Sequence, residues 1–384
     1  MDSDRPFVAT SYGVLSTYPP TQCGLATFSQ ALLQSLRSAT DEVGVIRVLD
    51  ADELASVTTE HPWIRTDPHG AASAAAALNR YDVAIVQHEY GIFPGTDGDE
   101  ILAVARALHV PTITVLHTVL VTPSPHQREI LEELVAEASV VVTMTNTARQ
   151  RLIDNYEVDP DIVQVIPHGA DAPPVSRRTR RRPGNREPVV LTWGLLGEGK
   201  GIEWAIDAMA QLSDLRPRPQ YWVVGQTHPK VRASQGEVYR DRLIERATSA
   251  AQGSVHFDDR YLTSAELHQL VQRADIVLLP YDSREQVTSG VLIEAVTAGK
   301  PVISTGFPHA VELLSSGAGL IVERQDPTSI AEALRRVLTE PGLASSMARE
   351  SQRIAPDLLW PAVADRYRRV AAQMLRPDVA MASA

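Results

Sequence analysis

The chain has 384 residues, of which 44% are hydrophobic and 22% are charged, and its formal net charge at pH 7 is −11. This length predicts two domains, the composition is typical of a soluble globular protein, and the acidic balance argues against a nucleic-acid partner. The sequence contains no apolar run long enough for a transmembrane helix and no apolar segment of a signal peptide near its start, and its single cysteine, Cys23, excludes an internal disulfide. We therefore expect a cytoplasmic protein.

The first half of the chain alternates between strand and helix patterns. Residues 7–17 predict a strand, a loop ends at Gly24, and apolar residues at helical spacing follow. A glycine in this position lets the backbone approach a phosphate or a sugar closely, although an ordinary βα turn has the same pattern. Further strands are expected at 43–48, 83–87, 111–116, 140–143 and 163–166, with helices at 71–78, 127–137 and 148–156. The alternation predicts a doubly wound parallel sheet of the Rossmann type.

Polar residues follow two of these strands directly. His88, Glu89 and Tyr90 come after the strand at 83–87, and His117 comes after the strand at 111–116. Open α/β sheets bind their ligands outside the carboxyl ends of the strands, so these residues are candidates for a site. A structural role remains the alternative, which for His117 is that of a hydrogen-bonded core histidine.

Two further segments allow both a functional and a structural interpretation. Asp97-Gly98-Asp99 resembles a divalent-metal pattern, but it lies in an expected loop of the first half with no histidine beside it in the sequence, so a polar turn is expected. Residues 173–187 are rich in arginine and proline, with arginines at 177, 178, 180–182 and 186. This segment is either a solvated linker or a patch for acidic lipid headgroups or an anionic substrate.

The second half of the chain repeats the alternation. A strand at 189–193 leads into a glycine-rich loop, 194–201, which contains Gly197 and Lys200. Backbone amides and an ammonium group suit a diphosphate, but the loop matches neither the Walker A nor the GxGxxG pattern and is weak evidence alone. Later strands are expected at 220–224, 255–257, 276–279, 302–304 and 320–322, with helices at 203–212, 239–250, 264–273 and 328–338 and a loop at 306–310.

The segment from 284 to 305 carries the strongest signal. A Ser289-Gly290 turn opens a helix that ends at Gly299. The first amides of a helix lack partners and its dipole favours an anion, so the amides of Ser289, Gly290, Val291 and Leu292 could bind a phosphate. Glu294 lies one turn further on, where a carboxylate can accept hydrogen bonds from a sugar diol. The segment therefore predicts a pocket for a phosphorylated sugar or a nucleotide.

Several motifs occur together in one order along nearly the whole chain: YPPTQCGLATF at 18–28, VIPHGAD at 165–171, GEGKGIEWAIDAM at 197–209 and ADIVLLPY at 274–281, followed by the segment just described. In this order they resemble the retaining glycosyltransferases of family four, which have the GT-B fold. The resemblance implies two Rossmann-like domains facing a central cleft: residues 1–172 completed by the helical segment 358–384, a linker at 173–187, and a donor domain at 188–357.

The resemblance also implies roles for residues. The family has two glutamates separated by seven residues; the second is Glu294 here, expected to bind the ribose, and the first position is Gln286. Gln286 can bind sugar hydroxyls but supplies no negative charge. Leu195 replaces an arginine that the family usually has before Lys200. His117 matches a histidine near the anomeric centre of the donor sugar, and Gly24 closes the diphosphate site.

These features predict a retaining hexosyltransferase that moves sugar from an NDP-sugar of the UDP-glucose or GDP-mannose type to a hydroxyl acceptor. The expected acceptor is a carbohydrate or a lipid-linked molecule bound beside His88, Glu89 and Tyr90, with at most peripheral contact to the inner face of a membrane. We expect neither a cofactor nor a metal ion. The alternatives are a GT-B sugar-nucleotide epimerase, which would need acid/base carboxylates at the sugar, and a binding protein that has lost catalysis.

Overall fold

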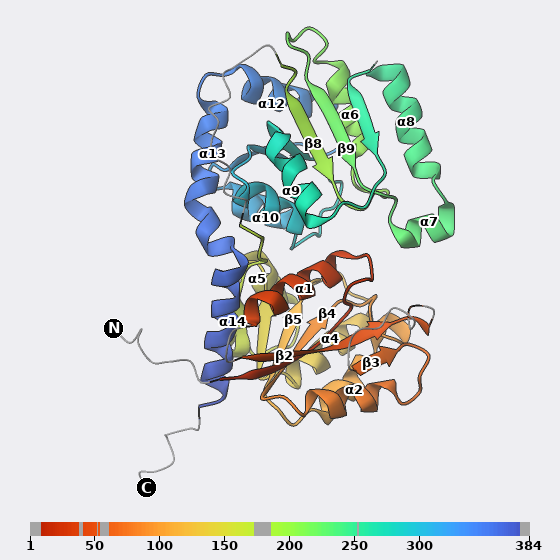
Figure 1. Ribbon diagram of the computed structural model, residues 1–384, viewed down its shortest axis with the longest axis vertical. Helices are drawn as coiled ribbons and strands as arrows, with labels where there is room; N and C mark the ends of the chain where they lie inside the picture. The colour runs from red at the N-terminus through yellow and green to blue at the C-terminus, as the bar shows by residue number, and fades with distance from the viewer. Residues whose placement is uncertain are drawn as a thin grey trace. The chain divides into compact units, whose positions relative to one another are not determined.

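A computed structural model describes residues 9–37, 41–51, 53, 61–172, 186–251 and 253–376. These residues form two compact units (Figure 1). One unit contains the described residues up to Gly169 together with those from Trp360 onward, and the other spans Ala170–Leu359. Most of the expected linker at 173–187, including the arginines at 177–182, lies outside the described residues.

The first unit is built on a seven-stranded parallel sheet with the order β3-β2-β1-β4-β5-β6-β7. Its strands are β1 (Ser11–Ser16), β2 (Glu42–Leu49), β3 (His61–Ile64), β4 (Val83–His88), β5 (Thr112–Leu116), β6 (Val140–Thr143) and β7 (Val163–Val165). Strands β4, β5 and β6 are buried along their whole length, as their continuous apolar runs require in a sheet covered on both faces.

Helices cover both faces of this sheet. They are α1 (Gly24–Leu36), α2 (Gly70–Leu78), α3 (Ile101–Ala107), α4 (Pro125–Ala136), α5 (Asn146–Asn155) and α14 (Trp360–Met374), with short 3₁₀ turns η2 (Thr96–Gly98) and η3 (Pro160–Ile162). Buried residues of α1 and α14 pack on one face of the sheet, and those of α2, α3 and α4 pack on the other. The last helix of the chain therefore completes the core of the first unit.

The second unit repeats the architecture with six parallel strands in the order β10-β9-β8-β11-β12-β13. The strands are β8 (Val189–Trp193), β9 (Gln220–Val224), β10 (Val255–Asp258), β11 (Ile276–Leu279), β12 (Val302–Thr305) and β13 (Gly319–Val322). In both sheets the strand order reverses beside the first strand, between β1 and β4 and between β8 and β11. Loops at the carboxyl ends of these strand pairs form the usual ligand crevice of such sheets.

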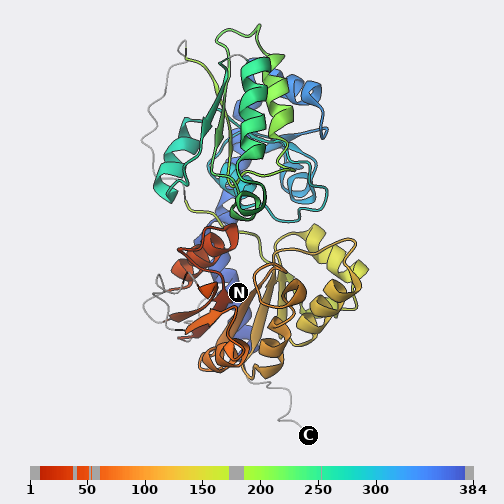
Figure 2. The same cartoon turned by 90° about the vertical axis from the view of Figure 1, so that its right-hand side faces the viewer.

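The helices of the second unit are α6 (Ile202–Ala210), α7 (Pro229–Gln235), α8 (Val238–Ala250), α9 (Ser264–Arg273), α10 (Gly290–Thr297), α11 (Pro308–Leu314), α12 (Pro327–Thr339) and α13 (Leu343–Ile354), followed by η4 (Ala355–Leu358). Helices α6 and α8 run side by side on the face turned toward the viewer in Figure 2. Together with α12 they enclose one core, and α9, α10 and α11 enclose the other.

The structure corrects several expectations from the sequence. The residues 306–310 are not all loop, because Pro308 takes the first position of α11, where its missing N–H costs nothing. Strand β3 and helices α3, α7 and α13 were not predicted. Strand β3 and helices α3 and α7 are short, and β3 contains a proline, so their periodic signals are weak. No helix among the described residues is both long and apolar enough to cross a membrane.

Candidate functional site in the second unit

The glycine-rich loop after β8 is pressed against the segment after β11. Gly201 has a φ of +62°, and a Cβ at that position would lie 1.8 Å from the carbonyl oxygen of Pro280, so only glycine fits. The amide of Asp282 donates a hydrogen bond to the carbonyl of Gly199 at 2.9 Å. The two loops that flank the reversal of strand order are thus held together at the carboxyl edge of the sheet.

Lys200 projects from this loop as a cation without an anionic partner. Its Nζ lies 4.3 Å from the centroid of the Tyr281 ring, and within the described part of the chain it forms no hydrogen bond or ion pair. Burial lowers the pKa of Lys200 below its usual value, because desolvation disfavours the ammonium form. A buried ammonium is costly unless an anion accompanies it, so this position favours a negatively charged ligand.

The start of α10 offers fewer free amides than the sequence predicted. The Ser289 amide donates to Nδ1 of the buried His309 at 2.9 Å, and the Leu292 amide donates to the capping Oγ of Ser289 at 3.3 Å. Of the four predicted amides, those of Gly290 and Val291 remain without a partner among the described residues. Sequence reasoning missed His309, which comes from α11.

Gln286 is held in one orientation just before this helix. Its side-chain nitrogen donates to the carbonyl of Thr288 at 2.9 Å, and its own backbone carbonyl accepts a hydrogen bond from the amide of His309 at 3.4 Å. The side-chain oxygen is then the group that Gln286 can offer as an acceptor. A neutral amide in this place can bind sugar hydroxyls but contributes no charge.

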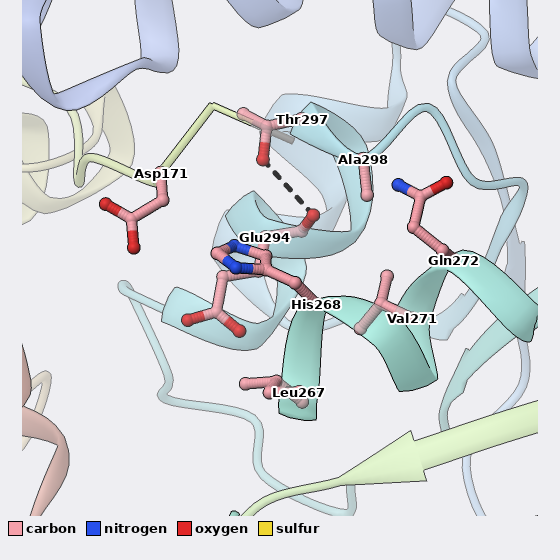
Figure 3. Close-up of a pocket in the computed structure, with 8 residues that line it drawn as sticks. All are labelled: Asp171, Leu267, His268, Val271, Gln272, Glu294, Thr297 and Ala298. Carbon is pink, nitrogen blue, oxygen red and sulfur yellow. Dashed lines mark hydrogen bonds between the residues drawn. The ribbon is translucent and has the colours of Figure 1, made fainter. Parts of the chain in front are cut away.

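Glu294 lines a pocket between α9, α10 and the segment after Ala170 (Figure 3). Asp171, from that segment, and His268, on α9, also line it. Indole Nε1 of Trp193 donates to Glu294 Oε2 at 3.2 Å. Burial, assisted by the negative charge of Asp171, raises the pKa of Glu294 to about 7, while the indole hydrogen bond opposes that rise. The sequence did not indicate Trp193 or His268, and it suggested no role for Asp171, which ends the VIPHGAD motif.

Candidate functional site in the first unit

His117 lies at the carboxyl end of β5, and a neighbouring side chain fixes its tautomer. Its Nε2 lies 2.7 Å from Oε1 of the buried Gln87, and the edge of its ring meets the Phe28 ring at a centroid distance of 4.8 Å. Burial, helped by the nearby His168 and His88, holds the pKa of His117 well below its usual value. The neutral ring carries its proton on Nε2, toward Gln87, which leaves Nδ1 as a hydrogen-bond acceptor.

His88, the last residue of β4, and Glu89 and Tyr90 after it neighbour His117 through the pairing of β4 with β5, and the amide of His117 donates to the carbonyl of His88 at 3.1 Å. His88 is fully buried, packs edge-on against Tyr90 and stacks on Phe93, and neither ring nitrogen has a hydrogen-bond partner. Burial lowers its pKa to about 4. Glu89 accepts a hydrogen bond from the Thr118 hydroxyl, and the Tyr90 hydroxyl donates to the carbonyl of Gln127 at 3.0 Å. His88 therefore has no surface in this structure with which to touch an acceptor.

Gly24 is the first residue of α1, directly after the loop that follows β1. A Cβ added to Gly24 would meet no atom within 4 Å, and its φ is not in the left-handed region. The fold itself therefore does not require glycine at this position. An open backbone at the start of a helix suits close approach of a ligand.

The Asp97-Gly98-Asp99 segment has a histidine beside it in the structure. It includes the 3₁₀ turn η2, and His126 contacts both aspartates, with Nδ1 3.3 Å from Asp97 and Nε2 3.5 Å from Asp99. The sequence shows no histidine beside this segment, but α4 brings His126 to it through the fold. Among the described residues, no group of three or more histidine, cysteine, aspartate or glutamate side chains is placed to hold a metal ion.

Comparison with known proteins

Two family models match successive parts of the chain. The model described as Glycosyltransferase Family 4 matches residues 23–172, and the model described as Glycosyl transferases group 1 matches residues 187–340. A D-inositol 3-phosphate glycosyltransferase of Salinispora arenicola is 31% identical over 255 residues, and that of Corynebacterium jeikeium is 28% identical over 265 residues. These matches cover 62% and 64% of this chain but only 56% and 60% of the relatives' own lengths.

Solved structures share the fold of the chain. A glycosyltransferase from Rickettsia africae has a TM-score of 0.75 at 16% identity, with 96% of this chain and 99% of that chain covered. Anabaena HepE in complex with UDP-glucose has a TM-score of 0.71 at 18% identity, with coverage of 94% and 99%. At these identities the likeness establishes the fold, which is GT-B. The two family models together match most of the chain, so its sequence is like that of the family-four glycosyltransferases.

Proposed function

We propose that the protein transfers a hexosyl group from a nucleoside-diphosphate sugar to a hydroxyl acceptor with retention at the anomeric carbon. The observation that carries this proposal is Lys200, a half-buried ammonium without an anionic partner in the described chain, in the glycine-rich loop at the carboxyl edge of β8. The unpaired amides of Gly290 and Val291, at the start of α10, are suited to the same kind of ligand. The relatives named for glycosyl transfer and the HepE complex with UDP-glucose support a nucleotide-sugar donor.

In the proposed reaction the acceptor oxygen attacks the anomeric carbon on the face from which the diphosphate departs. The bond from that carbon to the diphosphate oxygen breaks, and the departing diphosphate takes the acceptor proton. Lys200 and the two amides stabilise the charge that develops on the diphosphate, which is the largest contribution available to such a reaction. The scheme assigns no step to a metal ion or a cofactor.

The remaining residues bind and orient the donor. Glu294 binds the ribose diol, and Gln286 accepts hydrogen bonds from the transferred sugar through its side-chain oxygen. His117 offers Nδ1 as an acceptor to a sugar hydroxyl, which its neutral state allows at physiological pH. Glu89 and Tyr90 line the acceptor side, with the enclosed His88 packed behind Tyr90. The acceptor is a carbohydrate or a lipid-linked molecule, and the reaction takes place in the cytoplasm or at the membrane surface that faces it.

The experiment that tests this function uses purified protein with labelled UDP- and GDP-sugars, with and without candidate acceptors. We expect release of nucleoside diphosphate that depends on the acceptor, and a product of retained configuration. Epimerised donor without diphosphate release would assign the protein to the epimerases. Tight binding without turnover of any donor would make it a sugar-nucleotide-binding protein that has lost catalysis.

A further inference from the structure

Lys200 is the only side-chain cation that the proposed function places on the diphosphate, and the arginine expected before it is Leu195. A second hydrogen-bond donor lies in the neighbouring loop, after β9. The amide of Leu196 donates to the carbonyl of Gln226 at 2.9 Å, and the amide of His228 donates to the carbonyl of Leu196 at 2.8 Å. These bonds and a parallel bridge between Leu196 and Thr227 extend the pairing of β8 and β9 past the strand ends. The loop that carries Lys200 thus also contains Leu196, the residue that positions the backbone of His228.

The tautomer of His228 follows from its contacts. Nδ1 accepts a hydrogen bond from the backbone amide of Lys230 at 3.2 Å, which caps α7. A neutral imidazole with an acceptor at Nδ1 has its proton on Nε2. In the described chain His228 has no other side-chain partner, and its side chain is partly exposed, so the Nε2–H group is free to donate.

The charges around His228 favour this neutral form. Burial lowers the pKa of His228, and the positive charges of Lys230 on α7 and Lys200 in the glycine-rich loop lower it further. Arg232, also on α7, is paired at 3.3 Å with Glu237, the N-cap residue of α8. A second proton would also have to go onto Nδ1, where it would face the amide of Lys230.

We infer that His228 is a donor-binding residue whose neutral Nε2–H group hydrogen-bonds the same diphosphate that Lys200 binds. This inference rests on the proposed function and extends it, because it adds an uncharged donor beside the single lysine of the loop. His228 then contributes direction and a hydrogen bond, while Lys200 contributes charge. Since the phosphate rather than the base is contacted, the contribution is the same for uridine and guanosine nucleotides.

The test is calorimetric titration of UDP and GDP into the full-length protein at pH 6, 7 and 8. His228→Ala should weaken the binding of whichever nucleotide binds by about tenfold, the usual size of a lost hydrogen bond to a charged group. His228→Gln, whose amide can both accept from Lys230 and donate to phosphate, should restore most of the affinity. His256→Ala is the matched control, because His256 is exposed on β10 and pairs with Gln220. Melting temperatures establish that each variant is folded.

The outcomes are distinguishable. Unchanged affinity in a folded His228→Ala protein would overturn the inference. If UDP and GDP bind the wild type about equally, a loss of affinity for only one of them would also overturn it, because His228 would then contact the base. The ratio of wild-type to His228→Ala affinity should stay constant from pH 8 to pH 6; a ratio that grows as the pH falls would mean that a cationic imidazole binds. A wild-type protein that binds neither nucleotide would instead refute the proposed function itself.

Discussion

The carboxyl edges of the two sheets have the same topology but different electrostatic character. In the first unit, His88, His117 and His168 all have a pKa lowered mainly by burial, so these three histidines are neutral at physiological pH. In the second unit, Lys200 has no anionic partner among the described residues, and the carboxyl of Glu294 has a pKa raised to about 7. The first edge combines neutral histidines and aromatic rings with the carboxyl of Glu89, whereas the second contains a cation that no described residue neutralises.

This difference shows how one architecture can serve two halves of a transfer reaction. A diphosphate carries charge that a compensating cation and free amides can bind, whereas a sugar hydroxyl needs a neutral partner of defined hydrogen-bonding direction. The same strand order and loop positions supply the cation and amides in one unit and the neutral hydrogen-bonding groups in the other. The chemistry is therefore decided by a few residues at the strand ends, and substitutions at those residues test the comparison.

The largest effect is expected from removing the charge of the second edge. Lys200→Met keeps an apolar stem against Tyr281 but removes the ammonium group, so turnover should fall by roughly 100- to 1000-fold, the usual cost of losing one such stabilising group. The measurement is nucleoside diphosphate release under saturating donor. Lys230→Met is the control, because Lys230 is exposed on α7 and its backbone amide, which caps the helix, is retained. Equal turnover in the two variants would remove Lys200 from the mechanism.

The second effect concerns the buried carboxyl. Because the pKa of Glu294 is raised to about 7 in the folded protein, its ionisation costs stability that is regained as the pH falls below 7. Glu294→Gln should therefore be more stable than the wild type by roughly 2 kcal/mol at pH 8, with the difference disappearing near pH 5. The same variant should bind nucleotide more weakly. Urea unfolding at both pH values and nucleotide titration check the two halves of this prediction.

If the stability difference between Glu294→Gln and the wild type did not change with pH, the surroundings of Glu294 would not disfavour its ionised form. Asp171→Asn sharpens the result, since it removes the neighbouring negative charge that helps to raise the pKa of Glu294. In the Asp171→Asn background the Glu294→Gln advantage should be smaller and should level off at a lower pH. Less repulsion brings the folded-state pKa of Glu294 closer to its unfolded value, so its ionisation costs less stability at alkaline pH.

The third effect tests whether His88, in the first unit, is neutral in the folded protein. His88 has a pKa of about 4 in the folded protein, so the unfolded chain takes up its proton first as the pH falls below about 6.5. The stability that depends on neutral His88 is present above that pH and is lost progressively between about 6.5 and 4. The free energy of unfolding of His88→Phe, relative to that of the wild type, should therefore rise by about 2 kcal/mol between pH 7 and pH 5. His256→Phe, at an exposed site, should show no such change. If the stability of His88→Phe depended on pH in the same way as that of the wild type, the prediction would be contradicted.

The smallest effect separates ligand approach from folding at Gly24. Gly24→Ala adds a methyl group where no atom lies within 4 Å, so the folded state should be unchanged or stabilised by up to about 0.5 kcal/mol. Activity should nevertheless fall about tenfold, because the methyl group occupies space meant for a ligand. Gly169→Ala provides the contrast, since its Cβ would lie 2.3 Å from the ring of Trp360 and should lower the melting temperature. A fully active Gly24→Ala enzyme would show that no ligand approaches this residue closely.

Much of the fold follows from local pattern. The alternation of apolar strands and amphipathic helices predicts two parallel sheets, and the bounds predicted for β6, β8, β9, β11 and α9 agree with the structure. The segments that escaped prediction have weak local signals: β3 contains a proline among four residues, and α7 has no buried residue. Their formation is decided by the elements around them rather than by their own sequence.

The sequence predicts where a candidate site lies but not the contacts within it. Lys200 and Glu294 stand out because a loop and a helix start have recognisable patterns, and their roles stay predictions. The sequence could not reveal that His309 occupies the Ser289 amide, or that Trp193 donates to Glu294, because these contacts join residues far apart in the chain. Such contacts decide which amides are free and what the pKa of a carboxyl is, and they exist only once the sheet has formed.

The rarity of lysine in this chain turns Lys200 into a natural reporter. The sequence has three lysines, and every other basic side chain is arginine or histidine. Lys300 donates from Nζ to the carbonyls of Gln272 and Ala274, and Lys230 is exposed. Because the pKa of Lys200 is lowered, its amine is more nucleophilic near neutral pH than an ordinary lysine amine. A mild acylating reagent followed by peptide mass analysis can therefore read the occupancy of this one side chain, and a bound diphosphate would shield it from the label.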